Sequence, residues 1–269
     1  MERVIFNNGE SHVGWLKFLG GKVMIIVQMS DLHCSDTPYF LKDKLTSAIN
    51  EINELNPDIV VVAGDLTDHG FKTEFEEAKR FVDQIECPGK IITMGNHDSL
   101  YTGYLLFEEF FGSASGVLET DQCNVIYVNT ARPDRDEGRV GRDQIKFIRE
   151  NVSEGKLNIL VMHHHLIPVP DTGLEIAIVE DAGDVLKMMS QVNIDFVLSG
   201  HRHRPWMWRL NNMRFLFSGA VSTIRLRGFF ENSYNVIEVK DKQVTAKLKI
   251  VDGPFLDFSK VIHQTRTVF

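Results

Sequence analysis

The sequence predicts an α/β protein with two β-sheets and with helices on their outer faces. Short apolar runs rich in β-branched residues alternate with longer stretches in which apolar residues recur every three or four positions. This alternation is typical of strands and amphipathic helices, and strand–helix–strand units imply right-handed crossovers in a largely parallel sheet. After about residue 206 the pattern changes to paired short runs joined by brief polar turns, which indicates β-hairpins and therefore some antiparallel strands.

The expected elements follow one another in a regular order. The strand-like runs that precede polar segments are residues 23–29, 59–63, 91–94, 159–162 and 196–199. The helix-like stretches are residues 39–55, 71–85, 142–152 and 179–192. The first of them ends at Asn56, because the proline that follows disfavours the helical conformation at that residue. The expected hairpins pair residues 117–120 with 124–130, 206–210 with 213–218, and 234–239 with 244–250.

Length and composition narrow the class of protein. The 269 residues, 43% of them hydrophobic and 25% charged, can bury a core without disulfides. Apolar runs fall short of the ~18–20 residues that a membrane span needs. Three scattered cysteines, Cys34, Cys87 and Cys123, form no CxxC motif and cannot all pair, which indicates a reducing compartment and a cytoplasmic location. The net charge of −8 argues against general nucleic-acid binding but leaves an anionic substrate compatible, because metal ions can dominate the local field.

The two ends of the chain differ from the segment between them. Residues 1–22 have no clear period, and an N-terminal extension and an added edge hairpin fit them equally. One domain is expected over residues 23–269. Residues 254–269 form an apolar tail, and two arrangements are open for it: packing on its own domain, or packing on a second subunit in a homodimer.

Polar residues suited to metal binding directly follow five of the strand-like runs. The segments are SDLH at 30–33, GDLTD at 64–68, GNHD at 95–98, HHH at 163–165 and GHRH at 200–203. Because ligands of α/β sheets bind beyond the carboxyl ends of the strands, these segments are expected to converge. Seven of the ten histidines lie in them, where a random scatter would place one or two. Imidazole, carboxylate and amide donors without thiolate suit Mn, Fe, Zn or Co.

The ordered set DxH, GD, GNHD, H and GHxH resembles the calcineurin-like metallophosphoesterase superfamily over roughly residues 24–221. The resemblance implies a four-layer αββα sandwich in which two mixed β-sheets are flanked by helices. It also implies two divalent or trivalent metal ions per chain. The implied ligands are Asp31, His33, Asp65 and His203 for one ion, and Asp65, Asn96, His163 and His201 for the other, with Asp65 bridging the two.

Histidines outside the implied ligand set also have expected roles. His97 is interpreted as the proton donor to the leaving alkoxide or a stabiliser of the transition state, with Asp98 orienting its ring. Among the three consecutive histidines, spacing from the strand favours His163 as the ligand, although many relatives read His-His-Pro-Pro where this chain has His-His-His-Leu-Ile-Pro. His164 and His165 are then expected behind the ligands or facing the substrate.

Arginines and tryptophans near the last histidine motif leave alternatives open. Arg202 and Arg204 alternate with the histidines and could hold phosphate by paired hydrogen bonds, or could be structural. The arginines of residues 132–142 fit a solvated loop better than a substrate contact. Trp206 and Trp208 share one strand face, and packing there is favoured over stacking on a base.

The function implied by these residues is hydrolysis of a phosphoester. Two ions about 3.5–4 Å apart clamp the attacking and leaving oxygens of an in-line displacement at phosphorus. The chain resembles the compact class III cyclic nucleotide phosphodiesterases and glycerophosphodiesterases, which implies hydrolysis of a small diester, such as a 3′,5′-cyclic nucleotide, by a metal-bound hydroxide. The GDLTD segment lacks the Val and Arg of the protein-phosphatase motif GDxVDRG and the tyrosine of purple acid phosphatases.

Other functions stay open. A phosphomonoesterase or a lipid-nucleotide pyrophosphohydrolase of the same superfamily is the main alternative. Residues 105–111, LLFEEFF, could cap a lipid substrate, although a buried helix is the plainer interpretation. A non-catalytic scaffold is disfavoured because all seven ligand positions are filled.

Overall fold

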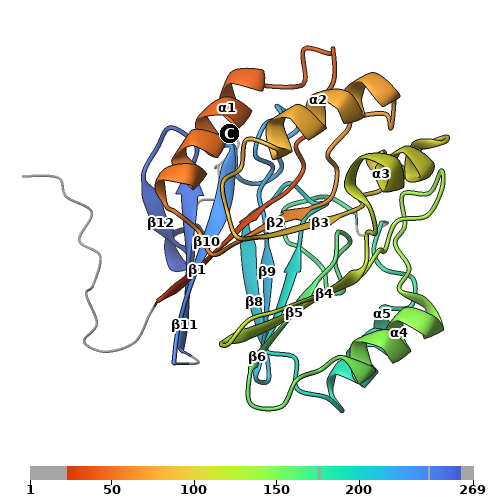
Figure 1. Ribbon diagram of the computed structural model, residues 1–269, viewed down its shortest axis with the longest axis vertical. Coiled ribbons are helices and arrows are strands. Elements are labelled where there is room, and N and C mark those ends of the chain that lie inside the picture. The colour runs from red at the N-terminus through yellow and green to blue at the C-terminus, as the bar shows by residue number, and fades with distance from the viewer. Residues whose placement is uncertain (1–22, 175–176, 242, 262–269) are drawn as a thin grey trace, which may run out of the picture.

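The computed structural model describes residues 23–174, 177–241 and 243–261, and its core is a pair of six-stranded mixed sheets (Figure 1). Helices α1, α2 and α3 lie on the outer side of one sheet, and α4 and α5 lie on the outer side of the other. The predicted four-layer α/β sandwich is therefore confirmed. Residues 1–22 and 262–269, about which the sequence left alternatives open, lie outside the described residues.

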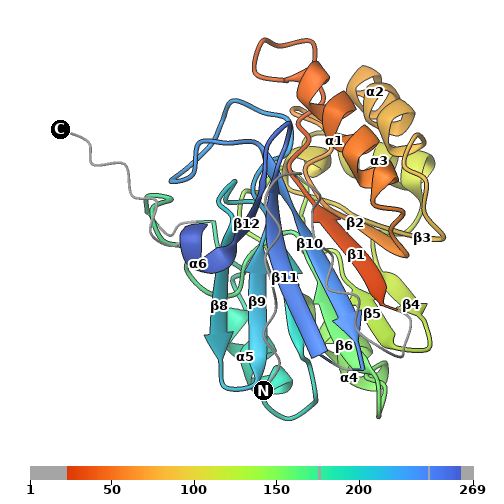
Figure 2. The ribbon, with the colours of Figure 1, turned by 90° about the vertical axis from the view of Figure 1, so that its left-hand side faces the viewer.

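The first sheet has the strand order β12-β11-β10-β1-β2-β3. Its strands are β1 (Met24–Met29), β2 (Ile59–Ala63), β3 (Gly89–Thr93), β10 (Ser233–Lys240), β11 (Gln243–Ile250) and β12 (Phe255–Asp257). Strands β1, β2 and β3 are parallel, and their crossovers contain α1 (Lys42–Glu54) and α2 (Lys72–Val82). The predicted hairpin of β10 and β11 adds antiparallel strands beside β1, as Figure 2 shows.

The second sheet has the strand order β4-β5-β6-β7-β9-β8. Its strands are β4 (Gly116–Glu119), β5 (Cys123–Tyr127), β6 (Leu157–Val161), β7 (Phe196–Ser199), β8 (Trp206–Leu210) and β9 (Met213–Phe217). The four inner strands are parallel, and the hairpin partners β4 and β8 are antiparallel edges. Helices α4 (Gly141–Glu150) and α5 (Ala182–Met189) lie between the parallel strands along the chain.

The inner strands are almost wholly apolar because successive side chains point to opposite faces of the sheet and both faces are buried. In β2, Val60 and Val62 contact the α1–α2 layer, whereas Val61 belongs to the cluster between the two sheets. A strand buried on both faces has no solvated side, so it shows no polar alternation. Three apolar clusters result, one under each helical layer and one between the sheets.

Helix α1 shows how the sequence sets the helix boundaries. Its buried residues, Leu45, Ala48, Ile49 and Ile52, follow the predicted three- and four-residue spacing. The helix begins three residues later than the predicted 39, because a turn from Thr37 to Phe40 precedes it. It ends before Asn56, which has a positive φ of 48°.

The C-terminal segment packs on its own domain as far as it is described. Helix α6 (Phe258–Val261) follows β12, and Phe258 and Val261 are buried in the cluster between the sheets (Figure 2). This part of the tail packs as the first of the two arrangements expected for residues 254–269 has it, and residues 262–269 lie outside the described part of the chain. Among the described residues, no helix is long and apolar enough to cross a membrane.

The segment considered as a lipid cap is a core helix. Helix α3 (Gly103–Phe111) buries Phe107 and packs Leu106, Phe110 and Phe111 against the α1–α2 cluster. Only its Leu105 is a large exposed hydrophobic residue. The buried-helix interpretation is therefore confirmed. Trp206 is likewise buried on the α4–α5 side of its sheet, as the packing interpretation predicted, while Trp208 is partly exposed.

A buried polar contact joins the two sheets. The Gln28 amide on β1 donates hydrogen bonds to the carbonyls of Ser199 (3.0 Å) and Leu216 (3.4 Å) in the second sheet. The Asn235 amide on β10 donates to Gln28 Oε1 (3.0 Å) and to the Phe217 carbonyl (3.2 Å). Both side chains are fully buried. The contact sets β1 against β7 and β9 close to the ends from which the polar segments emerge.

Replacing this amide should cost stability even though the new side chain is apolar. Gln28→Leu would leave buried carbonyls and the Asn235 amide unpaired, so the free energy of unfolding should fall by about 1–3 kcal/mol. Urea denaturation of the full chain measures the change. Gln84→Leu, at an exposed position beyond α2, is the matched control and should stay within about 0.5 kcal/mol. Equal stability of Gln28→Leu and the parent would show that the contact is not stabilising.

Candidate metal centre

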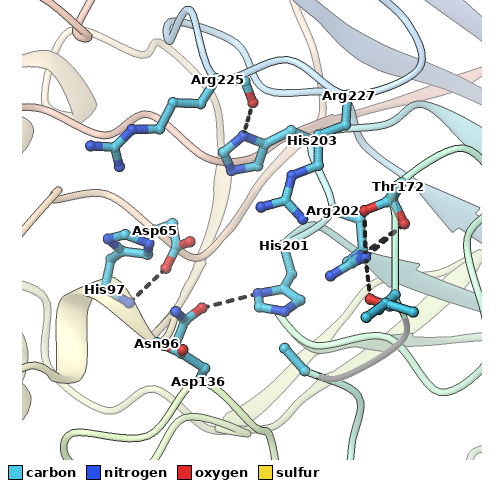
Figure 3. A pocket seen from close by; sticks show the side chains of 12 residues that line it. Asp65, Asn96, His97, Asp136, Thr172, His201, Arg202, His203, Arg225 and Arg227 are labelled. Atoms are coloured by element: carbon cyan, nitrogen blue, oxygen red, sulfur yellow. Dashed lines mark hydrogen bonds between the residues drawn. The ribbon is translucent and has the colours of Figure 1, made fainter.

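The five polar segments meet where the strands of the two sheets end. Figure 3 shows residues from three of them, with Asp65, Asn96 and His201 directed toward one another. Backbone hydrogen bonds align them: the Asp31 N–H donates to the Gly64 carbonyl, and the Gly200 N–H donates to the His163 carbonyl, each at 3.0 Å. The His201 N–H donates to both carboxylate oxygens of Asp31 at 3.1 and 3.2 Å. Residues far apart in the chain are thus held together by main-chain contacts before any ligand is considered.

One group of side-chain donors contains Asp31, His33, Asp65 and His203, and all four are buried. The Nε2 atoms of His33 and His203 lie 3.0 Å apart. Nε2 of His203 is 3.3 Å from Asp31 Oδ1, and Nε2 of His33 is 3.8 Å from Asp65 Oδ2. These atoms converge on one small volume.

A second group lies on the other side of Asp65. Nε2 of His163 is 3.3 Å from Asp65 Oδ2 and 3.1 Å from the amide oxygen of Asn96. The same amide oxygen is 3.0 Å from Nδ1 of His201 (Figure 3). Asp65 Oδ2 therefore faces a histidine of each group. The structure brings all seven residues expected as ligands into two adjoining clusters.

Hydrogen bonds on the far side of the rings select the tautomer of three histidines. Nδ1 of His163 donates to the Ala63 carbonyl at 2.7 Å, and Nδ1 of His203 donates to the Arg225 carbonyl at 2.5 Å. Nδ1 of His33 donates to Asp68 Oδ1 at 3.2 Å. With the hydrogen on Nδ1, each Nε2 has a lone pair that points into the cluster, which is the arrangement of metal-binding histidines.

The clusters fit divalent cations on their own geometry. Lone-pair atoms face one another at 3.0 Å, which a shared cation would make favourable. Nε2 of His201 is buried and has no hydrogen-bond partner among the described residues. The donors are imidazole, carboxylate and amide groups, a set that suits first-row divalent ions. The clustered histidines and aspartates thus support binding of divalent metal ions.

The pKa values of the clustered side chains also indicate that the site favours bound positive charge. Burial disfavours protonated His33 and lowers its pKa to about 4, so the ring is neutral and able to act as a ligand. Burial also opposes protonation of His163, but the charges of Asp65 and Asp31 outweigh it and raise the pKa to about 9, so without a bound cation Nε2 holds a proton and with one it is free to act as a ligand. Although burial opposes ionisation of Asp65, the surrounding histidines hold its pKa well below the usual range. Two ionised carboxylates therefore require cationic partners here.

The main chain at the cluster is strained. Twelve non-glycine residues of the described part of the chain have positive φ, and five of them belong to the two clusters. The five are Asp31, His33, Asp65, His201 and His203, with φ between 50° and 71°. A left-handed conformation costs about 1 kcal/mol or more for a residue with a Cβ atom. Strain of this kind concentrates at functional sites.

Glycine at two positions allows the loops to approach closely. A Cβ atom on Gly95 would collide with the Asp65 backbone nitrogen and carboxylate, and one on Gly200 would collide with Ser30. Both glycines immediately precede residues of the clusters. The glycines of GNHD and GHRH are thus explained by close approach of the main chain.

Asp68 and Arg225 are part of the site although neither was expected as a ligand or as a catalytic residue. Asp68 receives two hydrogen bonds from the Arg225 guanidinium, at 2.5 and 3.0 Å, besides the one from His33. Burial opposes ionisation of Asp68, but His33 and Arg225 lower its pKa to about 2. The carboxylate therefore orients His33. Asp68 stood in the recognised GDLTD segment, whereas Arg225 lies 157 residues away with no local motif.

His97 and Asp98 have different surroundings from those expected. Nδ1 of His97 donates to the Asp68 carbonyl at 2.6 Å, and its backbone N–H donates to Asp65 Oδ1 at 3.0 Å. The Asp98 carboxylate does not supply the expected orienting contact: it accepts from the N–H and hydroxyl of Thr67 (2.9 and 2.8 Å) and from the N–H of Gly95 (2.9 Å). Asp98 thus joins the loops after β2 and β3, and burial with the Asp65 charge raises its pKa to about 6.

The other histidines of the triple lie behind the clusters. Nδ1 of His164 accepts from the Thr130 hydroxyl (2.8 Å) and its Nε2 donates to the Asp136 carbonyl (3.1 Å), so both ring nitrogens are engaged. The ring of His165 is buried and stacks on that of His201, with centroids 5.5 Å apart. These contacts favour His163 over His164 as the residue whose lone pair reaches the cluster.

The two arginines expected near substrate differ in position. Arg202 lines the cavity and donates to the hydroxyl and carbonyl of Thr172 (Figure 3). Arg204 is fully buried, donates to the Gly228 carbonyl and pairs with Asp171 at 3.1 Å. The guanidinium of Arg204 therefore supports a loop, as the structural alternative held.

A cavity of about 410 Å³ opens over the two clusters. Its lining includes four residues of the two clusters, Asp65, Asn96, His201 and His203, and also His97. The rest of the lining is Asp136, Thr172, Leu174, Ala177, Arg202, Arg225 and Arg227. A small polar ligand could enter and contact the donor atoms directly.

Comparison with known families agrees with this geometry. The model of the calcineurin-like phosphoesterase family matches residues 24–205. This chain belongs to the calcineurin-like phosphoesterases. It is therefore a phosphoesterase, and the matched stretch contains all seven residues of the two clusters.

Relatives of this phosphoesterase include proteins named as phosphodiesterases. A "Probable cyclic nucleotide phosphodiesterase" of Xenorhabdus bovienii is 24% identical over 76% of this chain and 89% of the relative. One of Synechococcus sp. is 24% identical over 68% of this chain and 74% of the relative. A "Probable glycerophosphodiester phosphodiesterase" of Arcobacter nitrofigilis is 26% identical over 67% of this chain and 72% of the relative.

Solved structures share the fold of this phosphoesterase. A dimetal phosphatase from Danio rerio superposes with a TM-score of 0.65 at 9% identity, over 87% of this chain and 98% of that one. A purple acid phosphatase from yellow lupin superposes with a TM-score of 0.69 at 15% identity, over 91% of this chain. This phosphoesterase spans about half of the lupin chain, 56%. At such identities the likeness shows the fold alone.

The revised role of Asp98 leads to a stability prediction. Asp98→Ala would leave three buried donors of Thr67 and Gly95 unpaired, so the free energy of unfolding should fall by about 2–4 kcal/mol. Urea denaturation measures this. Asp83→Ala, at an exposed aspartate paired with Lys79, should change it by less than about 0.5 kcal/mol. Unchanged stability with lost activity would instead support the original expectation that Asp98 orients His97.

Proposed function

We propose that this phosphoesterase binds two divalent metal ions and hydrolyses small phosphodiesters such as 3′,5′-cyclic nucleotides. The observation that carries the proposal is Asp65, whose carboxylate oxygen faces a histidine of each donor group at 3.3 and 3.8 Å. A carboxylate shared in this way suits two adjacent ions rather than one. The relatives named as cyclic nucleotide and glycerophosphodiester phosphodiesterases support a diester as substrate.

The proposed ligands follow the two donor groups. One ion would be held by Asp31, His33, Asp65 and His203, and the other by Asp65, Asn96, His163 and His201. His163 is proposed rather than His164, because Nε2 of His163 faces Asp65 and Asn96, whereas the His164 ring contacts Thr130 and the Asp136 carbonyl. Mn, Fe, Zn and Co all suit these donors.

The bound ions would supply Lewis acidity and a water whose pKa is lowered to about 7. The protein supplies orientation and proton transfer. The hydrogen bond from His97 Nδ1 to the Asp68 carbonyl leaves Nε2 as the ring atom that can act in the cavity. From there His97 can donate a proton to the leaving alkoxide. Burial opposes a charged His97 ring, but Asp65 and the Asp68 carbonyl raise its pKa above the usual value.

The size and the polar lining of the cavity favour a small substrate. Its volume of about 410 Å³ is at the lower end of the range for small-molecule pockets. Its lining is mostly polar and charged, and the helix considered as a lipid cap is packed into the core. These observations weigh against a lipid-linked substrate and support a compact polar diester.

Loss of the shared carboxylate should abolish hydrolysis. The Mn-reconstituted Asp65→Ala variant should hydrolyse bis-p-nitrophenyl phosphate far more slowly than the parent. The loss of rate should be much larger than the roughly 10–100-fold loss that is typical when a residue that only supports a metal ligand is replaced. The parent should bind about two metal ions per chain and prefer this diester to p-nitrophenyl phosphate. Steady-state kinetics and elemental analysis measure both quantities, with circular dichroism to verify the fold.

Asp121→Ala, at an exposed aspartate, is the control and should behave as the parent. Diester hydrolysis by folded Asp65→Ala at the parent rate would refute the proposed mechanism. A preference of the parent for the monoester would move the assignment to a phosphomonoesterase.

His97 should matter most for substrates with a poor leaving group. His97→Ala should lower kcat on 3′,5′-cyclic AMP, which expels an alkoxide, by about 10²–10⁴-fold. The effect on bis-p-nitrophenyl phosphate should be much smaller, since p-nitrophenolate leaves without protonation. His69→Ala, on a neighbouring partly exposed histidine outside the cavity lining, serves as the control. An equal loss on both substrates would argue against proton donation by His97.

A further inference from the structure

One wall of the cavity comes from a loop that lies beyond the family-matched stretch of residues 24–205. The loop connects β9 to β10 and contributes Arg225 and Arg227. Figure 3 shows the side chains of Arg225 and Arg227 on either side of His203. Neither arginine is among the seven residues proposed as metal ligands, and Arg225 supports two of them through Asp68 and through its own carbonyl.

The two arginines differ in how their charge is used. The guanidinium of Arg225 is paired with the Asp68 carboxylate and stacks over the ring of Tyr39, 4.8 Å from its centroid. The guanidinium of Arg227 has no hydrogen-bond or ion-pair partner within residues 23–174, 177–241 and 243–261. Figure 3 shows it directed into the cavity, between His203 and His201. Arg227 thus presents to a ligand in the cavity a cation that no described residue neutralises.

The loop around Arg227 is anchored on both sides. Before it, the Arg225 carbonyl accepts from His203 Nδ1, and the Arg225 side chain is held by Asp68. After it, the Gly228 carbonyl accepts from the buried guanidinium of Arg204, and Phe229 is buried. Because the main chain is fixed at these points, the position of Arg227 is set before a ligand binds. This reduces the entropy that is lost on binding.

We propose that Arg227 recognises a second anionic group of the substrate, distinct from the phosphate that is cleaved. This inference rests on the proposed function, in which the two metal ions and His97 act on the phosphate that is cleaved. A guanidinium is suited to phosphate and carboxylate because it can donate two parallel hydrogen bonds. The preferred substrates are then phosphodiesters that carry a further phosphate or carboxylate, and cyclic mononucleotides, with a single charge, are poorer substrates.

Matched dinucleotides test this substrate class. The dinucleotide dTdT has one internal diester, and its forms phosphorylated at the 5′ or the 3′ end add one anionic group to the same diester. For the metal-reconstituted parent, kcat/KM for at least one phosphorylated form should exceed that for dTdT by about 10–100-fold, the strength of a charge-assisted hydrogen bond. In Arg227→Ala this ratio should fall to about 1, and Arg227→Lys should keep part of it.

Binding without turnover provides a second readout. Calorimetric titration should show that the parent binds thymidine 3′,5′-bisphosphate at least tenfold more tightly than thymidine 5′-monophosphate, and that Arg227→Ala loses this difference. Arg80→Ala, at an exposed arginine of α2 outside the cavity, is the control and should keep both ratios. The two readouts separate this inference from the proposed function, because binding is measured even if no diester is cleaved.

Two results would overturn the inference. The first is a parent that shows no preference for the extra phosphate in either measurement. The second is an Arg227→Ala variant that loses activity equally on dTdT and its phosphorylated forms, since that result would place the guanidinium at the scissile phosphate. Failure of the parent to cleave bis-p-nitrophenyl phosphate would refute the proposed function but leave the bisphosphate titration decisive for Arg227.

Discussion

The carboxylates of Asp31 and Asp65 are buried side by side at the ends of adjacent parallel strands, and the surrounding structure compensates their charge. Isolated buried charges are very costly, so such groups persist only with cationic and hydrogen-bonding partners. Here the partners are the backbone N–H groups of His201 and His97 and a ring of imidazoles from both sheets. The need for these partners explains why five loops from two sheets must meet at one point.

For these five loops to meet at one point, the two sheets must be held at a fixed position relative to each other. The apolar cluster between them supplies cohesion, but apolar contact is not directional. The amides of Gln28 and Asn235 supply direction, because they bond only to particular carbonyls of β7 and β9. The same strands, β1 and β7, lead directly into Asp31 and His201, so a polar contact in the core helps to set the geometry of the site.

Much of this arrangement could be predicted from the sequence, because the information is local. Apolar periodicity predicts the strands and helices. The carboxyl ends of parallel strands share one edge of a sheet, which predicts that Asp31 and Asp65 converge in the first sheet and that His163 and His201 converge in the second. The pairing of Asp68 with Arg225 could not be predicted, because it depends on the path of a loop 157 residues away. The same holds for Asp98, whose bonds to Thr67 and Gly95 depend on how two loops cross. The residue types indicate which chemistry is possible, but which residues contact one another depends on the tertiary structure.

The left-handed backbone at Asp31, Asp65 and His201 has a consequence for how this protein tolerates change. Glycine or asparagine would relieve strain at each of these positions, and glycine at 31 or 65 would also remove a buried charge. Glycine at 31 or 65 would, however, also leave the N–H group of His201 or His97 without its carboxylate acceptor, so strain there cannot be relieved without losing a hydrogen bond between two loops. Backbone strain, buried charge and the hydrogen bonds that compensate this charge are thus combined in the same few residues of the site.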